Sequence, residues 1–164
     1  MSTDPTITPT AIPDGPRRRT PASTRLLHEW SLTQPWSAGP WYELRLGPTP
    51  LVSGTTAITP EMEASLRVFN RYSDLVGVVG NELLVVEAKM VADPGALSQL
   101  QHYVELIYSS PVYAQHPGKI VQGVLVWAVD DPIIHTRAAS YGFRVDVFAP
   151  DWVQTYLGTR FYHR

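Results

Sequence analysis

The chain lacks several features that would place it at once in a structural class. Its 164 residues include no cysteine, which excludes disulfides and thiolate metal ligands and agrees with a reducing cytoplasm. No stretch reaches the roughly 18 to 20 apolar residues that a membrane span needs. The opening sequence, MSTDPTITPTAIPDG, lacks the basic and apolar regions of a secretory signal. We therefore expect a cytoplasmic protein with one ordinary domain and no membrane contact.

The motifs of several enzyme classes are absent as well. There is no phosphate-binding glycine loop and no G-x-S-x-G nucleophile turn. The five histidines are scattered, without the close spacing of zinc ligands, which argues against a zinc site. They are His28, His102, His116, His135 and His163.

The charge is small overall but unevenly distributed. The net charge of −2 argues against a generic basic coat for nucleic acid. Residues 1–25 nevertheless carry a net +2, and residues 1–22 hold five of the fifteen prolines. We expect residues 1–25 to be a flexible or partner-bound arm, and residues 26–164 to form a single α/β domain. Such an arm can contact phosphate or an acidic partner, although a solvated tail explains it equally well.

The order of the predicted elements indicates an α/β fold with a central mixed sheet flanked by helices. The strand at 119–129 is apolar throughout and is expected to be covered on both faces. Thr59 and Pro60 predict a helix start, and Met62, Leu66 and Phe69 a buried face. The other expected elements are helices at 24–34, 59–70, 94–109, 131–142 and 151–161, strands at 41–47 and 143–150, and a β-hairpin at 73–90.

The predicted hairpin places two carboxylates opposite each other. The Gly-Asn dipeptide at 80–81 suits a two-residue turn, so Val79 pairs with Glu82 and paired residue numbers sum to 161. Asp74 then lies opposite Glu87, with Cβ atoms expected about 4.5 to 5.5 Å apart. Like charges at that distance destabilise the pair.

Three arrangements can relieve this repulsion: a protonated carboxyl, a neighbouring cation, or a bound metal ion. Lys89 follows Glu87 on the same face of the strand and can supply the cation. Two carboxylates also suit Mg²⁺, which takes one or two of them together with water and phosphate oxygens. A solvated ion-pair cluster is the structural alternative. Because the hairpin is apolar on both faces, we expect the charged trio at the mouth of a cleft instead.

Asp74 followed by Glu87-Ala88-Lys89 resembles the restriction-endonuclease-like, or PD-(D/E)xK, superfamily. The family pattern of a helix, a β-meander, a helix and a further strand is matched here from residue 59 to about residue 129. Ser73 stands where the family name has proline, a position that varies within the family.

The helix at 94–109 adds a second likeness. Gln99 and Tyr103 are similar to the Gln-x-x-x-Tyr motif of the recombination-nuclease branch, and residues four apart share one helix face. The structural alternative is a helix edge with a half-buried tyrosine.

The resemblance implies a role for each matched residue. Asp74, Glu87 and the carbonyl of Ala88 would hold one or two Mg²⁺ or Mn²⁺ ions, and Lys89 would orient the attacking water or stabilise charge on the phosphate. Gln99 and Tyr103 would position the site or the nucleic-acid backbone. An acid from the helix at 59–70 would complete the site. Glu63 is the first choice, Glu61 the second, and Glu43 of the strand at 41–47 the third.

These roles predict a Mg²⁺-dependent deoxyribonuclease with DNA as its partner. A different class of function is a structural or assembly component, such as a phage virion or connector protein, that keeps the nuclease fold without catalysis. The acidic body and the long arm suit that alternative, in which the arm contacts a protein partner or a second copy and the protein resides in a virion. A third hypothesis is an antitoxin-like or accessory DNA-binding module without chemistry.

Overall fold

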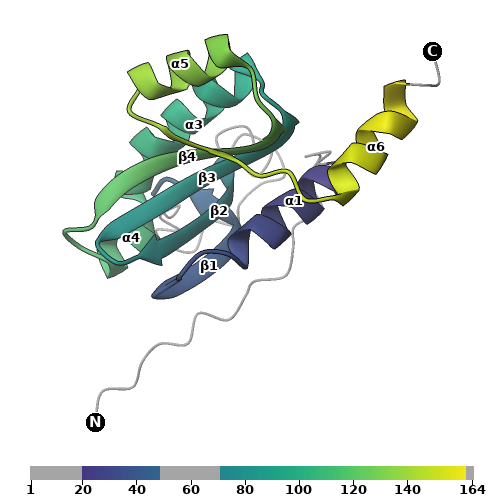
Figure 1. Ribbon diagram of the computed structural model, residues 1–164. Helices are drawn as coiled ribbons and strands as arrows, with labels where there is room; N and C mark the ends of the chain where they lie inside the picture. The colour runs from purple at the N-terminus through teal and green to yellow at the C-terminus, as the bar shows by residue number, and fades with distance from the viewer. Residues whose placement is uncertain (1–19, 49–70, 162–164) are drawn as a thin grey trace, which may run out of the picture.

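The computed structural model describes residues 20–48 and 71–161 of the chain. Its centre is a five-stranded mixed sheet in the order β1-β2-β3-β4-β5 (Figure 1). The first three strands form an antiparallel meander, and β3, β4 and β5 run parallel. The strands are β1 (Ala38–Leu46), β2 (Arg71–Val79), β3 (Glu82–Val91), β4 (Ile120–Val129) and β5 (Arg144–Val147).

Helices cover both faces of this sheet, which confirms the predicted α/β class (Figure 1). One face carries α1 (Pro21–Ser31), which packs on β3 and β4 and lies beside α6 (Trp152–Phe161). The other carries α3 (Pro94–Leu106), which continues as a 3-10 turn at Ile107–Ser109. The shorter helices are α4 (Pro111–Gln115) and α5 (Pro132–Ser140). No helix within these described ranges has the length and apolar character to cross a membrane.

Local capping signals determine where the helices begin. Asp93 and Asp131 precede a proline at the starts of α3 and α5, and each carboxylate accepts a hydrogen bond from a backbone N–H of the first turn. Thr20 does the same for α1. This helix therefore begins at Pro21, within the range 1–25 that was predicted as an arm, and Ala22 is already buried against α6.

The hairpin has the predicted register. Its paired residues run from Val79 with Glu82 to Leu75 with Val86, and each pair sums to 161. Gly80 has a φ of +56°, the left-handed conformation that this two-residue turn requires.

The predicted family pattern began at the helix expected at 59–70, whereas the meander includes β1, which precedes that range. The third strand of the meander is β1, which pairs with β2 through Tyr42–Leu75 and Leu44–Ser73. The helix that precedes the meander is thus α1. Residues 47–70 separate β1 from β2 in the sequence, so no local turn signal links the two strands. The helix predicted at 59–70, with Glu61 and Glu63, lies outside the described residues.

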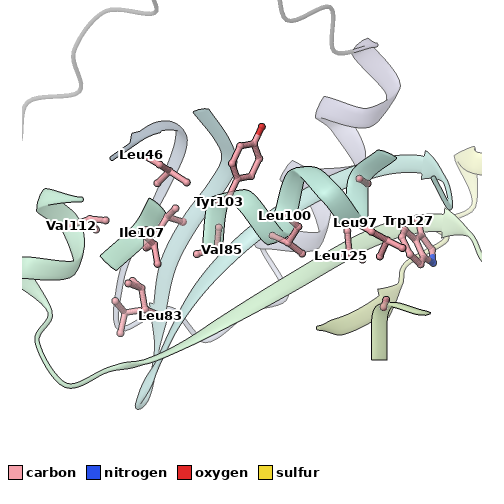
Figure 2. Packing of buried hydrophobic residues seen from close by; sticks show 14 residues of the cluster. Leu46, Leu83, Val85, Leu97, Leu100, Tyr103, Ile107, Val112, Leu125 and Trp127 are labelled. Atoms are coloured by element: carbon pink, nitrogen blue, oxygen red, sulfur yellow. The ribbon is translucent and has the colours of Figure 1, made fainter. Parts of the chain in front are cut away.

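Strand β4 is central and buried on both faces, as its uniform apolar sequence predicted. Val124 and Val126 face α1, whereas Leu125 and Trp127 belong to the cluster beneath α3. Figure 2 shows this second cluster, with Leu97 and Leu100 of α3 lying over the sheet.

Candidate active site

Asp74, Glu87 and Lys89 come together at the end of the hairpin that is remote from its turn. Asp74 lies two residues from Val76, and Glu87 two residues from Val85, so both carboxylates share the sheet face that α3 covers. Both are buried, with exposed fractions of 3% and 2%. Continuing the observed register by one residue beyond Leu75–Val86 places them opposite each other, as predicted.

The hydrogen-bond ladder between β2 and β3 ends at this point. Every second residue of β3, beginning with Glu82, directs its backbone N–H and C=O toward β2. Leu84 and Val86 follow, and Ala88 is the next in this series. Its N–H donates to Asp74 Oδ2 over 2.9 Å instead of to a backbone carbonyl of β2. The Asp74 carboxylate therefore replaces a backbone carbonyl as the acceptor for the Ala88 N–H. Because the N–H and C=O of a strand residue point to the same side, the carbonyl of Ala88 also faces the Asp74 side.

Lys89 forms an ion pair with Glu87, with 2.9 Å between Nζ and Oε1. Burial opposes the charge of Lys89, but the charge and hydrogen bond of Glu87, with the charges of Asp74 and Asp93, raise its pKa above the ordinary value. The lysine remains about one-third exposed, at 34% of its side chain. The ammonium thus links a buried carboxylate to the surface. Asp93, which caps the start of α3, was not among the predicted site residues.

Gln99 and Tyr103 lie on α3 but in different surroundings. Tyr103 is 1% exposed and belongs to the core cluster, where it packs among residues such as Leu46 and Ile107 (Figure 2). Gln99 is exposed. The tyrosine is therefore more deeply buried than the half-buried alternative supposed, and its positioning role with Gln99 stays a prediction.

Of the three acids considered as a further ligand, Glu43 is the one within the described residues. Tyr42 pairs with Leu75 and Leu44 with Ser73, so Glu43 occupies the register position opposite Asp74. Its backbone has a φ of +50°, which is uncommon for a residue with a side chain. Its side chain is exposed. The register therefore forms a row of three acids across the meander, of which Asp74 and Glu87 are buried and Glu43 is exposed.

The described residues suit a divalent cation that takes oxygen ligands. In the ranges 20–48 and 71–161, no three His, Asp or Glu side chains gather closely enough to form a protein-only metal cage. Mg²⁺ does not need such a cage, because it binds through one or two carboxylates and otherwise keeps water and phosphate oxygens. The buried pair of Asp74 and Glu87, with the carbonyl of Ala88 on the same side, matches that donor set.

The similarity of this chain to known proteins is low. No protein-family model matches the chain, and no curated protein matches it. One solved structure with a similar arrangement is a repair endonuclease from Pyrococcus abyssi, with a TM-score of 0.46 and 19% sequence identity. The similarity covers 80% of this chain and 48% of that protein. The chain thus spans about half the length of that endonuclease.

Proposed function

We propose that this chain is a metal-dependent nuclease that hydrolyses phosphodiester bonds of DNA. The observation that carries the proposal is the buried, opposed pair of Asp74 and Glu87 with Lys89 2.9 Å from Glu87. A stable sheet gains nothing from like charges placed opposite each other. A divalent cation, in contrast, can bind between two such carboxylates.

Each of these side chains has a distinct role in the proposed reaction. Asp74, Glu87 and the carbonyl of Ala88 would hold Mg²⁺ or Mn²⁺. The bound ion would polarise the scissile phosphate and lower the pKa of the attacking water. Asp74 is oriented for this by the Ala88 N–H, which fixes one of its oxygens. The carboxylates that raise the pKa of Lys89 favour its charged form, which would stabilise negative charge on the phosphate.

Cleavage of DNA by the purified protein tests the proposal. Labelled single- and double-stranded DNA would be incubated with the parent protein in Mg²⁺, in Mn²⁺ and in EDTA. We expect cleavage that needs the metal and falls at least about a hundredfold in Glu87→Gln and Lys89→Ala, as for loss of a group that stabilises charge in the transition state.

Two matched variants control for general effects on the fold. Glu105→Gln removes an exposed carboxylate from α3. Lys119→Ala removes an ammonium that donates to the Gly80 carbonyl, at the opposite end of the hairpin. Both should cleave like the parent. Equal activity in Glu87→Gln and Glu105→Gln would refute the site. If the parent neither cleaves DNA nor gains thermal stability from Mn²⁺, the assembly role becomes the better account of the fold.

A further inference from the structure

A second polar group lies at the edge of the sheet where the candidate site is found. Strands β3 and β4 run parallel, and Lys89 pairs with Trp127. Directly paired residues point to the same face, so both lie on the side of α3. Two pairs further along the register, Val91 and Val129 end their strands together. Asp130 follows at once, and His135 lies in the second turn of the adjoining helix α5.

Three side chains form a continuous hydrogen-bonded chain at this edge. The indole N–H of Trp127 donates to Asp130 Oδ1 over 2.8 Å, and His135 Nδ1 lies 2.8 Å from Asp130 Oδ2. Trp127 is fully buried, and in Figure 2 its indole nitrogen is on the side of the ring away from Leu97 and Leu125. The chain therefore connects the core beside Lys89 to a surface imidazole.

The tautomer of the His135 imidazole follows from its hydrogen-bond partner. Burial opposes the charge of Asp130, but hydrogen bonds from His135 and Trp127 lower the pKa of this carboxyl below its ordinary value. As a carboxylate, Asp130 only accepts hydrogen bonds, so Nδ1 of His135 must donate. The Nε2 edge is then the part of the ring left for another molecule. The His135 side chain is 42% exposed, so solvent reaches it.

Helix capping does not account for this arrangement. The sequences Val-Ala-Asp-Pro at 91–94 and Val-Asp-Asp-Pro at 129–132 are equivalent strand-to-helix junctions, and the second aspartate of the latter, Asp131, is the cap of α5. Asp130 is therefore an addition at the position where the first junction has Ala92.

We infer that His135, oriented by Asp130 and Trp127, contacts the DNA backbone next to the phosphate that Lys89 serves. This inference rests on the proposed nuclease function. The Nε2 edge of the ring would contact a phosphate oxygen of the neighbouring nucleotide. His135 would thus be a substrate-binding residue, and Asp130 a positioning residue that holds the ring.

DNA binding measured separately from cleavage tests this inference. Fluorescence anisotropy of a short labelled duplex would be recorded in the Glu87→Gln background, in which the DNA stays intact. We expect His135→Ala to raise Kd about tenfold, the value of one hydrogen bond to a charged group. His102→Ala, which removes an exposed histidine from α3, should change Kd less than about twofold.

Two further variants distinguish contact with DNA from a role in stability alone. His135→Lys offers a cationic donor to the phosphate without the imidazole, so it should restore most of the binding. Asp130→Asn still offers Trp127 an oxygen acceptor but loses the charge that orients His135, so it should weaken binding less than His135→Ala does.

In the cleavage assay, His135→Ala should raise KM more than it lowers kcat. Equal Kd values for His135→Ala and His102→Ala in a protein that cleaves DNA would overturn the inference and leave the nuclease proposal standing. A protein that neither binds nor cleaves DNA would overturn both.

Discussion

Glu87→Gln tests whether the opposed carboxylates are a strained site or an ordinary structural ion pair. The substitution removes two interactions of opposite sign: the attraction to Lys89 at 2.9 Å and the repulsion from Asp74 across the hairpin. At an effective dielectric constant of about 20, unit charges about 4 to 5 Å apart interact by about 3 to 4 kcal/mol. Because Lys89 is one-third exposed, solvent screens its attraction substantially.

The two effects should therefore nearly cancel in the absence of metal. We expect the free energy of unfolding of Glu87→Gln in EDTA to lie within about 1 kcal/mol of the parent value. Urea denaturation with linear extrapolation measures it, and equal m-values would show that the unfolding transitions are comparable. Glu105→Gln on the exposed surface of α3 provides the reference for a carboxylate without such neighbours.

Metal binding should then separate the two proteins. A ligand present at about 100 times its Kd stabilises the folded state by about 2.7 kcal/mol, so Mn²⁺ should raise the Tm of the parent and leave that of Glu87→Gln unchanged. The reasoning fails if the variant loses about 3 to 5 kcal/mol in EDTA. That result is typical of a broken buried ion pair, and it would make Glu87 a structural partner of Lys89.

Three further substitutions test the fold around the site. Gly77→Ala would place a Cβ 2.5 Å from Trp36 Cζ3, and this overpacking should cost about 1 to 3 kcal/mol by urea denaturation. Asp130→Asn should cost less than about 1 kcal/mol at pH 7, because the pair with His135 is partly exposed. Since the folded-state pKa of Asp130 is lowered, this difference should persist above its unfolded pKa of about 4 and vanish as pH falls through the folded value. Thr20→Ala removes the cap of α1 and should cost about 1 kcal/mol in thermal or urea unfolding.

The elements that the sequence predicted well are those with local signals. The Gly-Asn turn determined the hairpin register without reference to any other strand, and with it the opposition of Asp74 and Glu87. The helices expected from residues 94 and 131 begin at Pro94 and Pro132, each after an aspartate that caps the first turn. In each case a few adjacent residues determine the backbone conformation, so their pattern is sufficient.

The features that the sequence did not predict depend on contacts between distant segments. Strands β1 and β2 pair although residues 47–70 separate them in the sequence. No local pattern therefore indicated that Glu43 occupies the register position opposite Asp74. The chain formed by Trp127, Asp130 and His135 joins a strand, a loop and a helix. Its one sequence signal is the additional aspartate in Val-Asp-Asp-Pro at 129–132. This signal is recognised only by comparison with Val-Ala-Asp-Pro at 91–94, the equivalent strand-to-helix junction.

The end of the β2–β3 ladder shows why the site needs both local and distant structure. Another backbone pair would have joined Ala88 to Ser73, and the Ala88 N–H would then not be available to Asp74. Instead, the N–H of Ala88 holds the Asp74 carboxylate beside Glu87. The hairpin register brings Asp74 and Glu87 together. Because the ladder stops before Ala88, the N–H of Ala88 is available to orient the Asp74 carboxylate. A substitution that extended the ladder would thus weaken the site without changing any of its side chains.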